Sequence, residues 1–348
     1  FQYLSDHQGI DQDFSPASIY FARQDQKQKM FSEEFNIKST TDGRYKLLFG
    51  AFGFWQGIDN TVTLDYFTKD YATRKLYDTP AYGVAFYHQS TIDDLLTRGL
   101  SLTFGIRYDY EHTSNDFLFY KETDGGSEQM DAFDSRLKFS QVTPKIALQY
   151  MFPSTGMLYA TVTKGYKTGG FNTSFDREED RTFRPETSWN YELGAKHPFL
   201  DNRLNAEFCF FWIDWKNQQI YQMLATQNGQ YLRDAGRSES KGVEVSLQGN
   251  PVNGLMVQVN YGFTHATFKD YKDERRGIDY SGNFLPVVPR HTFAVGADYT
   301  IPNPCRHIDR FTVSANYTGT GRILWKEDNK VSQPYYGLLN AKVSATKD

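Results

Sequence analysis

The sequence predicts an all-β chain that forms part of a transmembrane antiparallel β-barrel. Three observations support this fold class. Apolar and polar residues alternate with period two in many segments, short and long connections alternate between those segments, and the composition is rich in both aromatic and charged residues. Aromatic residues make up 16% and charged residues 23% of the chain. A wall with one apolar face and one wet face accommodates both kinds of side chain.

The clearest alternation predicts long strands with two different faces. Phe104 and Ile106, for example, alternate with Thr103 and Gly105. One face of such a strand suits lipid and the other suits water. The same pattern occurs in residues 101–110, 145–152, 255–264, 293–300 and 311–318.

Connections of two lengths separate the predicted strands. Short turns are expected at residues 41–43, 153–156, 200–203 and 251–254. Long polar stretches, expected as loops, lie around residues 59–80, 113–132, 168–186, 270–284 and 320–333. Short turns at one rim and long loops at the other are typical of outer-membrane barrels, where the short turns are periplasmic. This division predicts about 14 or 15 strands.

Other fold classes fit the sequence less well. A soluble β-sandwich would have shorter strands and a core of Val, Ile and Leu, and a propeller would repeat about every 40 residues. No apolar stretch approaches the eighteen or so residues of a transmembrane helix. The net charge of -4, with dispersed Lys and Arg, gives no footprint for nucleic acid. Cys209 and Cys305 are too few to form a disulfide framework.

Four segments carry a resemblance to a known family. They read TVTKGYKTGGFN at 161–172, FRPETSWNYELG at 183–194, DAGR at 234–237 followed by KGVE at 241–244, and LPVVPRH at 285–291. In order and spacing they resemble the TonB-dependent outer-membrane receptors, most of all the pesticin/yersiniabactin-type siderophore receptors. Asp234 departs from the family's usual Asn at that position.

The motifs are also physically sensible in a barrel wall. Pro185 and Pro289 stand at strand starts, where the missing N–H costs the ladder least. Glu192 and Glu244 alternate with apolar neighbours, so we expect both to point into the lumen.

The resemblance implies a larger protein. Members of the family have an N-terminal plug inside a barrel of about 22 strands, preceded by a TonB box that contacts TonB, which acts with ExbB and ExbD. No such segments are recognisable here, so residues 1–348 are expected to form one incomplete barrel domain, without the plug, several early strands and the final strands. The implied location is the bacterial outer membrane, in contact with its lipid.

No catalytic or metal-binding constellation is evident in the sequence. The seven histidines are dispersed, and no Gly-rich phosphate loop, Gly-x-Ser-x-Gly elbow or Cys-x-x-Cys occurs. The acidic clusters at 93–94 and 178–180 are interpreted as solvated loops. We therefore expect neither enzymatic activity nor a resident cofactor or metal.

Ligand-binding residues are expected where inward side chains approach the outer rim. Counting upward from the turn at Leu200, Leu204, Ala206, Phe208, Phe210 and Trp212 should face lipid. The opposite parity, together with the end of the strand in 157–167, predicts an upper-lumen site of aromatic, amide and cationic groups that consists of Lys167, Trp215, Asn217, Gln219 and Tyr221.

The function implied by the resemblance is active import of an extracellular iron–siderophore complex, energised through TonB. Two alternatives stay open at this point. One is TonB-dependent import of a non-iron ligand such as cobalamin, thiamine or an oligosaccharide. The other is a passive porin, which needs no plug.

Overall fold

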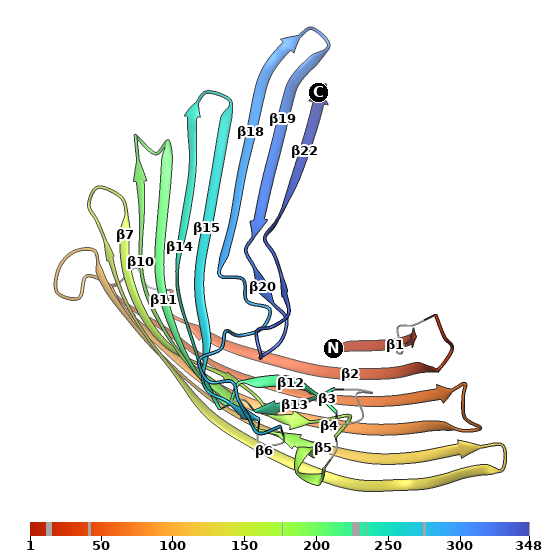
Figure 1. Cartoon of the computed structure of the whole chain (residues 1–348). Coiled ribbons are helices and arrows are strands. Elements are labelled where there is room, and N and C mark those ends of the chain that lie inside the picture. The colour runs from red at the N-terminus through yellow and green to blue at the C-terminus, as the bar shows by residue number, and fades with distance from the viewer. Residues whose placement is uncertain are drawn as a thin grey trace.

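The computed structural model describes residues 1–11, 16–40, 43–175, 177–224, 230–234, 236–273 and 276–347. Within these residues, fourteen antiparallel strands form one continuous curved sheet (Figure 1). The order in the sheet follows the order in the chain, so each strand pairs with the strands just before and after it, as in an up-and-down barrel wall. The fold class predicted from the alternation is confirmed.

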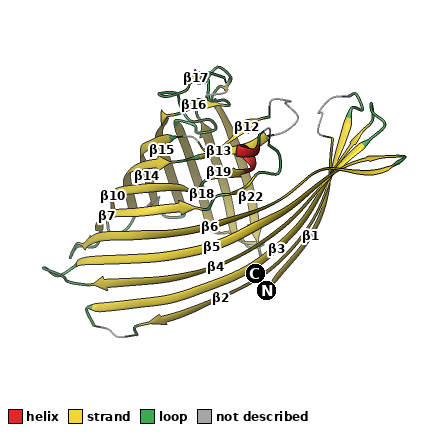
Figure 2. Cartoon of the chain, turned by 90° about the horizontal axis from the view of Figure 1, so that it is seen from below, coloured by secondary structure: helices red, strands yellow, loops and turns green. Residues whose placement is uncertain are grey.

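The first six strands of the sheet are long, apart from the edge strand β1. They are β1 (Gln2–Asp11), β2 (Tyr20–Lys38), β3 (Tyr45–Tyr66), β4 (Ala72–Ile92), β5 (Leu100–Thr123) and β6 (Gly126–Met151). The other eight are shorter and are β7 (Met157–Lys167), β10 (Glu186–Phe199), β11 (Leu204–Lys216), β14 (Arg237–Val252), β15 (Leu255–Asp270), β18 (His291–Cys305), β19 (Ile308–Thr320) and β22 (Tyr336–Thr346). Figure 2 shows β1–β6 side by side as a long array, with β7–β22 rising beyond one part of it.

In the described part of the chain, four pairs of short strands lie within the long loops at one rim of the sheet. The strand pairs are β8 (Gly170–Phe171) with β9 (Thr182–Phe183), β12 (Gln219–Met223) with β13 (Gln230–Asp234), β16 (Lys272–Asp273) with β17 (Ile278–Asp279), and β20 (Ile323–Leu324) with β21 (Ser332–Gln333). A 3-10 helix, η1 (Glu178–Arg181), lies in the β7–β10 loop. Within the described residues, no helix is both long and apolar enough to span a membrane.

The predicted short turns are found at the opposite rim. The turn at 153–156 joins β6 to β7, and that at 200–203 joins β10 to β11 through Leu200, Asp201 and Asn202, all at positive φ. The turn predicted at 251–254 is narrower, because Val252 still pairs with Leu255. The turn predicted at 41–43 lies partly outside the described residues, as does the Ala of the segment at 234–237.

Two predicted loops are instead strands. The stretches 59–80 and 113–132 belong to β3–β4 and β5–β6, whose connections are only 67–71 and 124–125. Because both faces of a strand meet water beyond the bilayer, the contrast between its faces fades while its backbone ladder continues. Polarity alone therefore indicated loops where the chain forms hairpins that extend past the membrane.

A small apolar core lies among the outer loops. It is built around Phe268 and Tyr271, which are 0% and 3% exposed, with ring centroids 4.9 Å apart. Ile220, from the β12–β13 hairpin, packs against this core. Burial of these rings holds the β15–β18 loop and the hairpin together, so the outer rim has fixed structure of its own.

Candidate functional site

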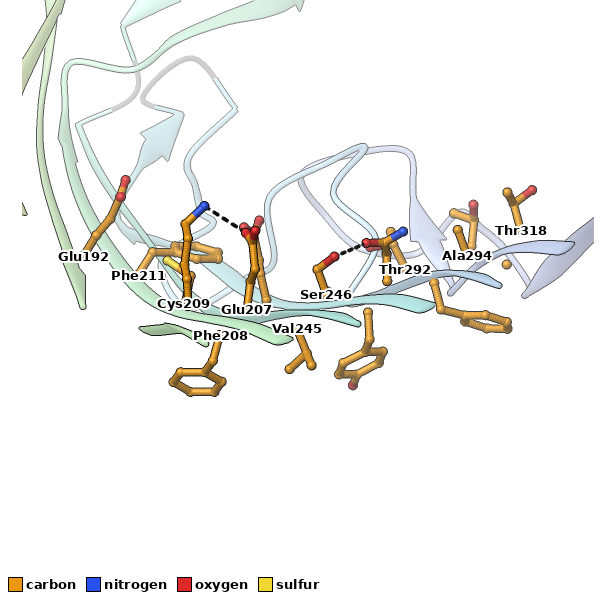
Figure 3. A pocket seen from close by; sticks show the side chains of 18 of the residues that line it. Glu192, Glu207, Phe208, Cys209, Phe211, Val245, Ser246, Thr292, Ala294 and Thr318 are labelled. Carbon is orange, nitrogen blue, oxygen red and sulfur yellow. Dashed lines mark hydrogen bonds and ion pairs between the residues drawn. The ribbon is translucent and has the colours of Figure 1, made fainter. Parts of the chain in front are cut away.

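The inner face of the wall is polar and the outer face is apolar. In Figure 3, Glu207, Cys209 and Phe211 of β11 point to one side of the sheet, together with Glu192, while Phe208 points to the other. The inward side chains line a cavity of about 820 Å³ that spans β7 to β19. The lipid-facing parity predicted for β11 is therefore confirmed at Phe208, which is 46% exposed.

Carboxylates dominate the charge of this cavity. Glu192, Glu207 and Glu244 line it, as predicted for the first and third of these residues, and Lys196 is the cation beside them. Lys196 Nζ lies 2.9 Å from Glu207 Oε2, and Asn190 donates a 2.6 Å hydrogen bond to Glu192. Glu192 and Glu244 make no ion pair among the described residues, so this wall offers anionic groups to whatever fills the lumen.

The outer face carries aromatic rings toward the long-loop rim. Tyr191 of β10 and Trp212 of β11 stack with ring centroids 5.0 Å apart. Both rings point outward, because Leu193 and Phe210 lie two residues away on the same face of the two strands and are 57% and 43% exposed. Aromatic rings are enriched where the hydrocarbon of a membrane meets its headgroups. We therefore expect this boundary near Tyr191 and Trp212, so that the ends of β11 and β14 at the long-loop rim lie outside the hydrocarbon.

A second hollow, of about 370 Å³, lies where β5 and β6 approach β7. Arg107 pairs with Asp109 at 2.8 Å and lies 5.4 Å from the ring centroid of Tyr87. Among the described residues, the buried hydroxyl of Tyr166, which lines this hollow, has no hydrogen-bond partner. An unpaired buried hydroxyl costs free energy, so a polar group from outside these residues would be stabilised there.

Asn172 joins two loops at the outer rim. Its Nδ2 donates to the carbonyls of Asp180 and Leu232, each at 2.8 Å, and its Oδ1 accepts from the Leu232 amide at 2.8 Å. The residue is only 6% exposed. One side chain thus ties the β7–β10 loop to the β12–β13 hairpin.

A second set of contacts joins the same two segments. The Gln219 side chain donates to the carbonyls of Thr168 and Arg184, at 2.8 and 3.1 Å, and the Gln219 backbone N–H donates to Glu186 Oε2 at 2.7 Å. Arg184 Nε lies 2.9 Å from Asp234 Oδ2. Asp234 therefore pairs with a cation at the position where the family's usual Asn could offer only a neutral amide.

The third attachment of the β7–β10 loop is aromatic. Phe175 packs edge-on against Phe117 and Phe133 of the β5–β6 hairpin, and the Arg181 guanidinium lies 4.0 Å from the Phe133 centroid. Tyr77 donates a hydrogen bond to the Thr173 carbonyl. The loop is thus held from both sides of the rim.

The five predicted ligand residues do not form a single row of inward-pointing side chains. Trp215 keeps the inward parity of Glu207, and Lys167 is exposed beside Glu186, its partner in register. Asn217, however, has φ 52°, which ends β11 and breaks the alternation. Gln219 is drawn into the rim contacts, and Tyr221 is 60% exposed on the hairpin.

Sequence reasoning missed the residues that organise the rim. Asn172, Glu186 and Asp234 all lie within three of the four quoted segments, so those segments were the available signal. Parity counting could not find them, because their roles depend on contacts between loops. Among the described residues, no group of three or more His, Cys, Asp or Glu side chains could hold a metal ion.

Comparison with known proteins decides the family. The family described as TonB dependent receptor-like, beta-barrel, matches residues 1–347. The chain belongs to this family. The ferric-pyoverdine receptor PbuA of a Pseudomonas strain is 26% identical over 254 residues, which are 70% of this chain and 28% of that receptor. The pesticin receptor of Yersinia pestis is 27% identical over 199 residues, 56% of this chain and 27% of that protein.

A solved structure confirms the fold of the receptor chain. The ferric yersiniabactin uptake receptor FyuA from Yersinia pestis matches with a TM-score of 0.78 at 20% identity, covering 94% of this chain and 48% of that one. The chain thus spans about half the length of this structure and 28% and 27% of the two curated relatives. It is an outer-membrane β-barrel segment, and its family consists of receptors and transporters.

Proposed function

We propose that residues 1–348 are one barrel domain of a receptor that imports an iron–siderophore complex across the outer membrane. The observation that carries this proposal is the polar inner face beneath a structured outer rim, in a chain that matches the receptor family over residues 1–347. Relatives named as ferric-pyoverdine and pesticin receptors support iron–siderophore complexes as the ligand class. The protein catalyses no reaction, and its energy comes from TonB with ExbB and ExbD.

In this mechanism the rim binds the ligand and the lumen conducts it. Lys167, Trp215 and Tyr221 contact the ligand from the wall and the hairpin, because they combine a cation with exposed aromatic surface. Asn217 and Gln219 position the hairpin that carries Tyr221. Below them, the carboxylates of the cavity pair with cationic groups of an inserted plug, which TonB displaces when ligand is bound.

Transport of labelled iron tests the proposed function. The intact receptor would be expressed in a strain that lacks its own ferric receptors, with and without TonB. We expect radioactive iron to enter from ferric pyoverdine, ferric yersiniabactin or a ferric catecholate only when TonB is present. Entry that persists without TonB would indicate a passive channel. Binding of cobalamin, thiamine or an oligosaccharide, with no binding of any ferric complex, would indicate a non-iron ligand.

Substitution at the rim tests the ligand-contact residues. Because truncating a buried aromatic contact costs more than about 1 kcal/mol, Trp215→Ala and Tyr221→Ala should each weaken binding of the transported complex by roughly tenfold. Tyr299→Ala, on the lipid-facing parity and 45% exposed, is the matched control and should bind normally. Unchanged affinity in both rim variants would remove these residues from the site.

A further inference from the structure

The extracellular ends of β3, β4 and β5 carry a group of lysines on aromatic rings. We call this group the cation–aromatic patch, and it consists of Lys69, Lys75, Lys121, Tyr66, Tyr71 and Phe119. None of these residues belongs to the cavities or to the rim contacts described above. The hairpins that carry them extend to the right in Figure 1, beside β1 and β2 and away from β7–β22.

The patch lies on the inner face of the wall. Tyr87 and Arg107 are partners in register on that face, and Lys75 pairs with Phe119 an even number of residues farther along the same two strands. Because successive residues of a strand alternate between faces, Lys75 and Phe119 share the face of Tyr87 and Arg107. Lys121 follows two residues after Phe119, on the same face.

The lysine ammonium groups lie over ring faces. Lys69 Nζ is 4.7 Å from the Tyr66 centroid and 5.3 Å from the Tyr71 centroid, and it donates a 3.1 Å hydrogen bond to the Tyr71 hydroxyl. Lys121 Nζ is also 4.7 Å from the Tyr71 centroid. The two rings lie 5.3 Å apart. Two cations therefore share one tyrosine, which fixes their spacing.

The charge of the patch is not neutralised from within the wall. Among the described residues, no carboxylate forms an ion pair with Lys69, Lys75 or Lys121. Burial lowers the pKa of Lys75, which rests 5.4 Å from the Phe119 centroid.

The opposite face of the same strands shows the contrast. There Arg74 pairs with Glu122 at 2.8 Å, and Arg23 of β2 pairs with Asp65 of β3 at 2.9 Å. These two arginines thus have carboxylate partners, whereas the three lysines of the patch contact ring faces instead.

We propose that the cation–aromatic patch is a capture site for an anion of several charges that carries aryl groups. Its ammonium groups attract the negative charge, and the tyrosine and phenylalanine rings offer surfaces for stacking of the aryl groups. A ferric complex of catecholate or phenolate ligands has this chemistry, and its onward passage to the lumen rests on the proposed import function. Two fixed lysines on one ring favour a ligand with closely spaced anionic groups.

A fluorescent aryl polyanion tests the patch independently of iron import. Binding of the trisulfonated dye pyranine to the intact purified receptor would be followed by fluorescence anisotropy at low salt. The test variant is Lys69→Gln/Lys121→Gln. The matched control is Lys27→Gln/Lys29→Gln, which removes the same charge from exposed outward positions of β2. Each of the two lost cations contributes on the order of 1 kcal/mol, so the test variant should bind pyranine about thirtyfold more weakly.

The outcomes separate this proposal from the proposed function. Support requires three results: weaker pyranine binding in the test variant only, recovery with Lys69→Arg/Lys121→Arg, and displacement of the dye by a ferric tris-catecholate. Equal pyranine affinity in wild type and test variant would overturn the capture site, whatever the iron transport shows. Equally strong displacement by inositol hexakisphosphate, which has no aryl group, would also overturn it. Pyranine binding at the patch without any iron uptake would instead count against the proposed function alone.

Discussion

Replacing Asn172 with Ala should loosen the attachment of the β12–β13 hairpin to the β7–β10 loop around Leu232, while the contacts of Gln219 remain. The substitution removes three hydrogen bonds of 2.8 Å from a side chain that is only 6% exposed. It leaves the Leu232 amide and the carbonyls of Leu232 and Asp180 without their partner. At about 1 kcal/mol for each hydrogen bond, the local opening free energy should fall by about 3 kcal/mol.

Hydrogen exchange at the Leu232 amide measures this loss directly. A decrease of about 3 kcal/mol corresponds to exchange that is roughly a hundredfold faster in the hairpin. The wall itself should be unaffected, so exchange in β14 and β15 and the thermal unfolding of the barrel should not change. Asn316→Ala, at an exposed position of β19, is the control. Unchanged exchange at Leu232 in Asn172→Ala would refute the assignment of Asn172 as one of the connections between the two segments.

Further substitutions test the wall, the periplasmic turns and the loop attachment. Gly242→Ala places a Cβ 2.1 Å from a β15 carbonyl oxygen and should destabilise the barrel by about 1–3 kcal/mol. Gly296→Ala meets only ordinary contacts and is the control. The temperature at which each variant loses its folded mobility on a gel compares their stabilities. Lys46 holds the pKa of Asp93 below its ordinary value of 3.8, so this stabilisation is present above about pH 4 and is lost as pH falls through the folded pKa. The unfolding rate of wild type should therefore rise more steeply from pH 5 to 3 than that of Asp93→Asn, and parallel profiles would exclude the contribution. Arg181→Ala removes a cation–π contact of roughly 1 kcal/mol and should speed proteolysis within 168–185. An unchanged cleavage rate would show that this contact does not stabilise the loop.

The wall could be predicted from sequence because lipid and water impose different residues on its two faces. Phe208 and Glu207 differ in type for that reason, and period-two counting placed both correctly. The same argument failed for residues 59–80 and 113–132, where water surrounds both faces. There the hairpins are stabilised by backbone pairing and by contacts between rings such as Phe117. Neither kind of contact requires apolar and polar residues to alternate along the sequence.

The outer rim was less predictable because its geometry depends on one backbone torsion and on contacts between loops. Asn217, at positive φ, redirects the chain, so counting from Glu207 to Trp215 succeeds and counting on to Gln219 does not. Asn is among the residues that adopt this conformation readily, but the sequence does not say which Asn does so. The ligand contacts assigned to Trp215 and Tyr221 remain predictions.

The unequal strand lengths give this part of the barrel wall an uneven outer edge. β6 has 26 residues and its neighbour across the hairpin 24, whereas β11 and β19 have 13 each. At about 3.3 Å per residue, the difference amounts to roughly 40 Å along the strand. Within the described part of the wall, the long hairpins therefore stand beside the shorter strands, and a solute that approaches from their side must pass them before it reaches the cavity.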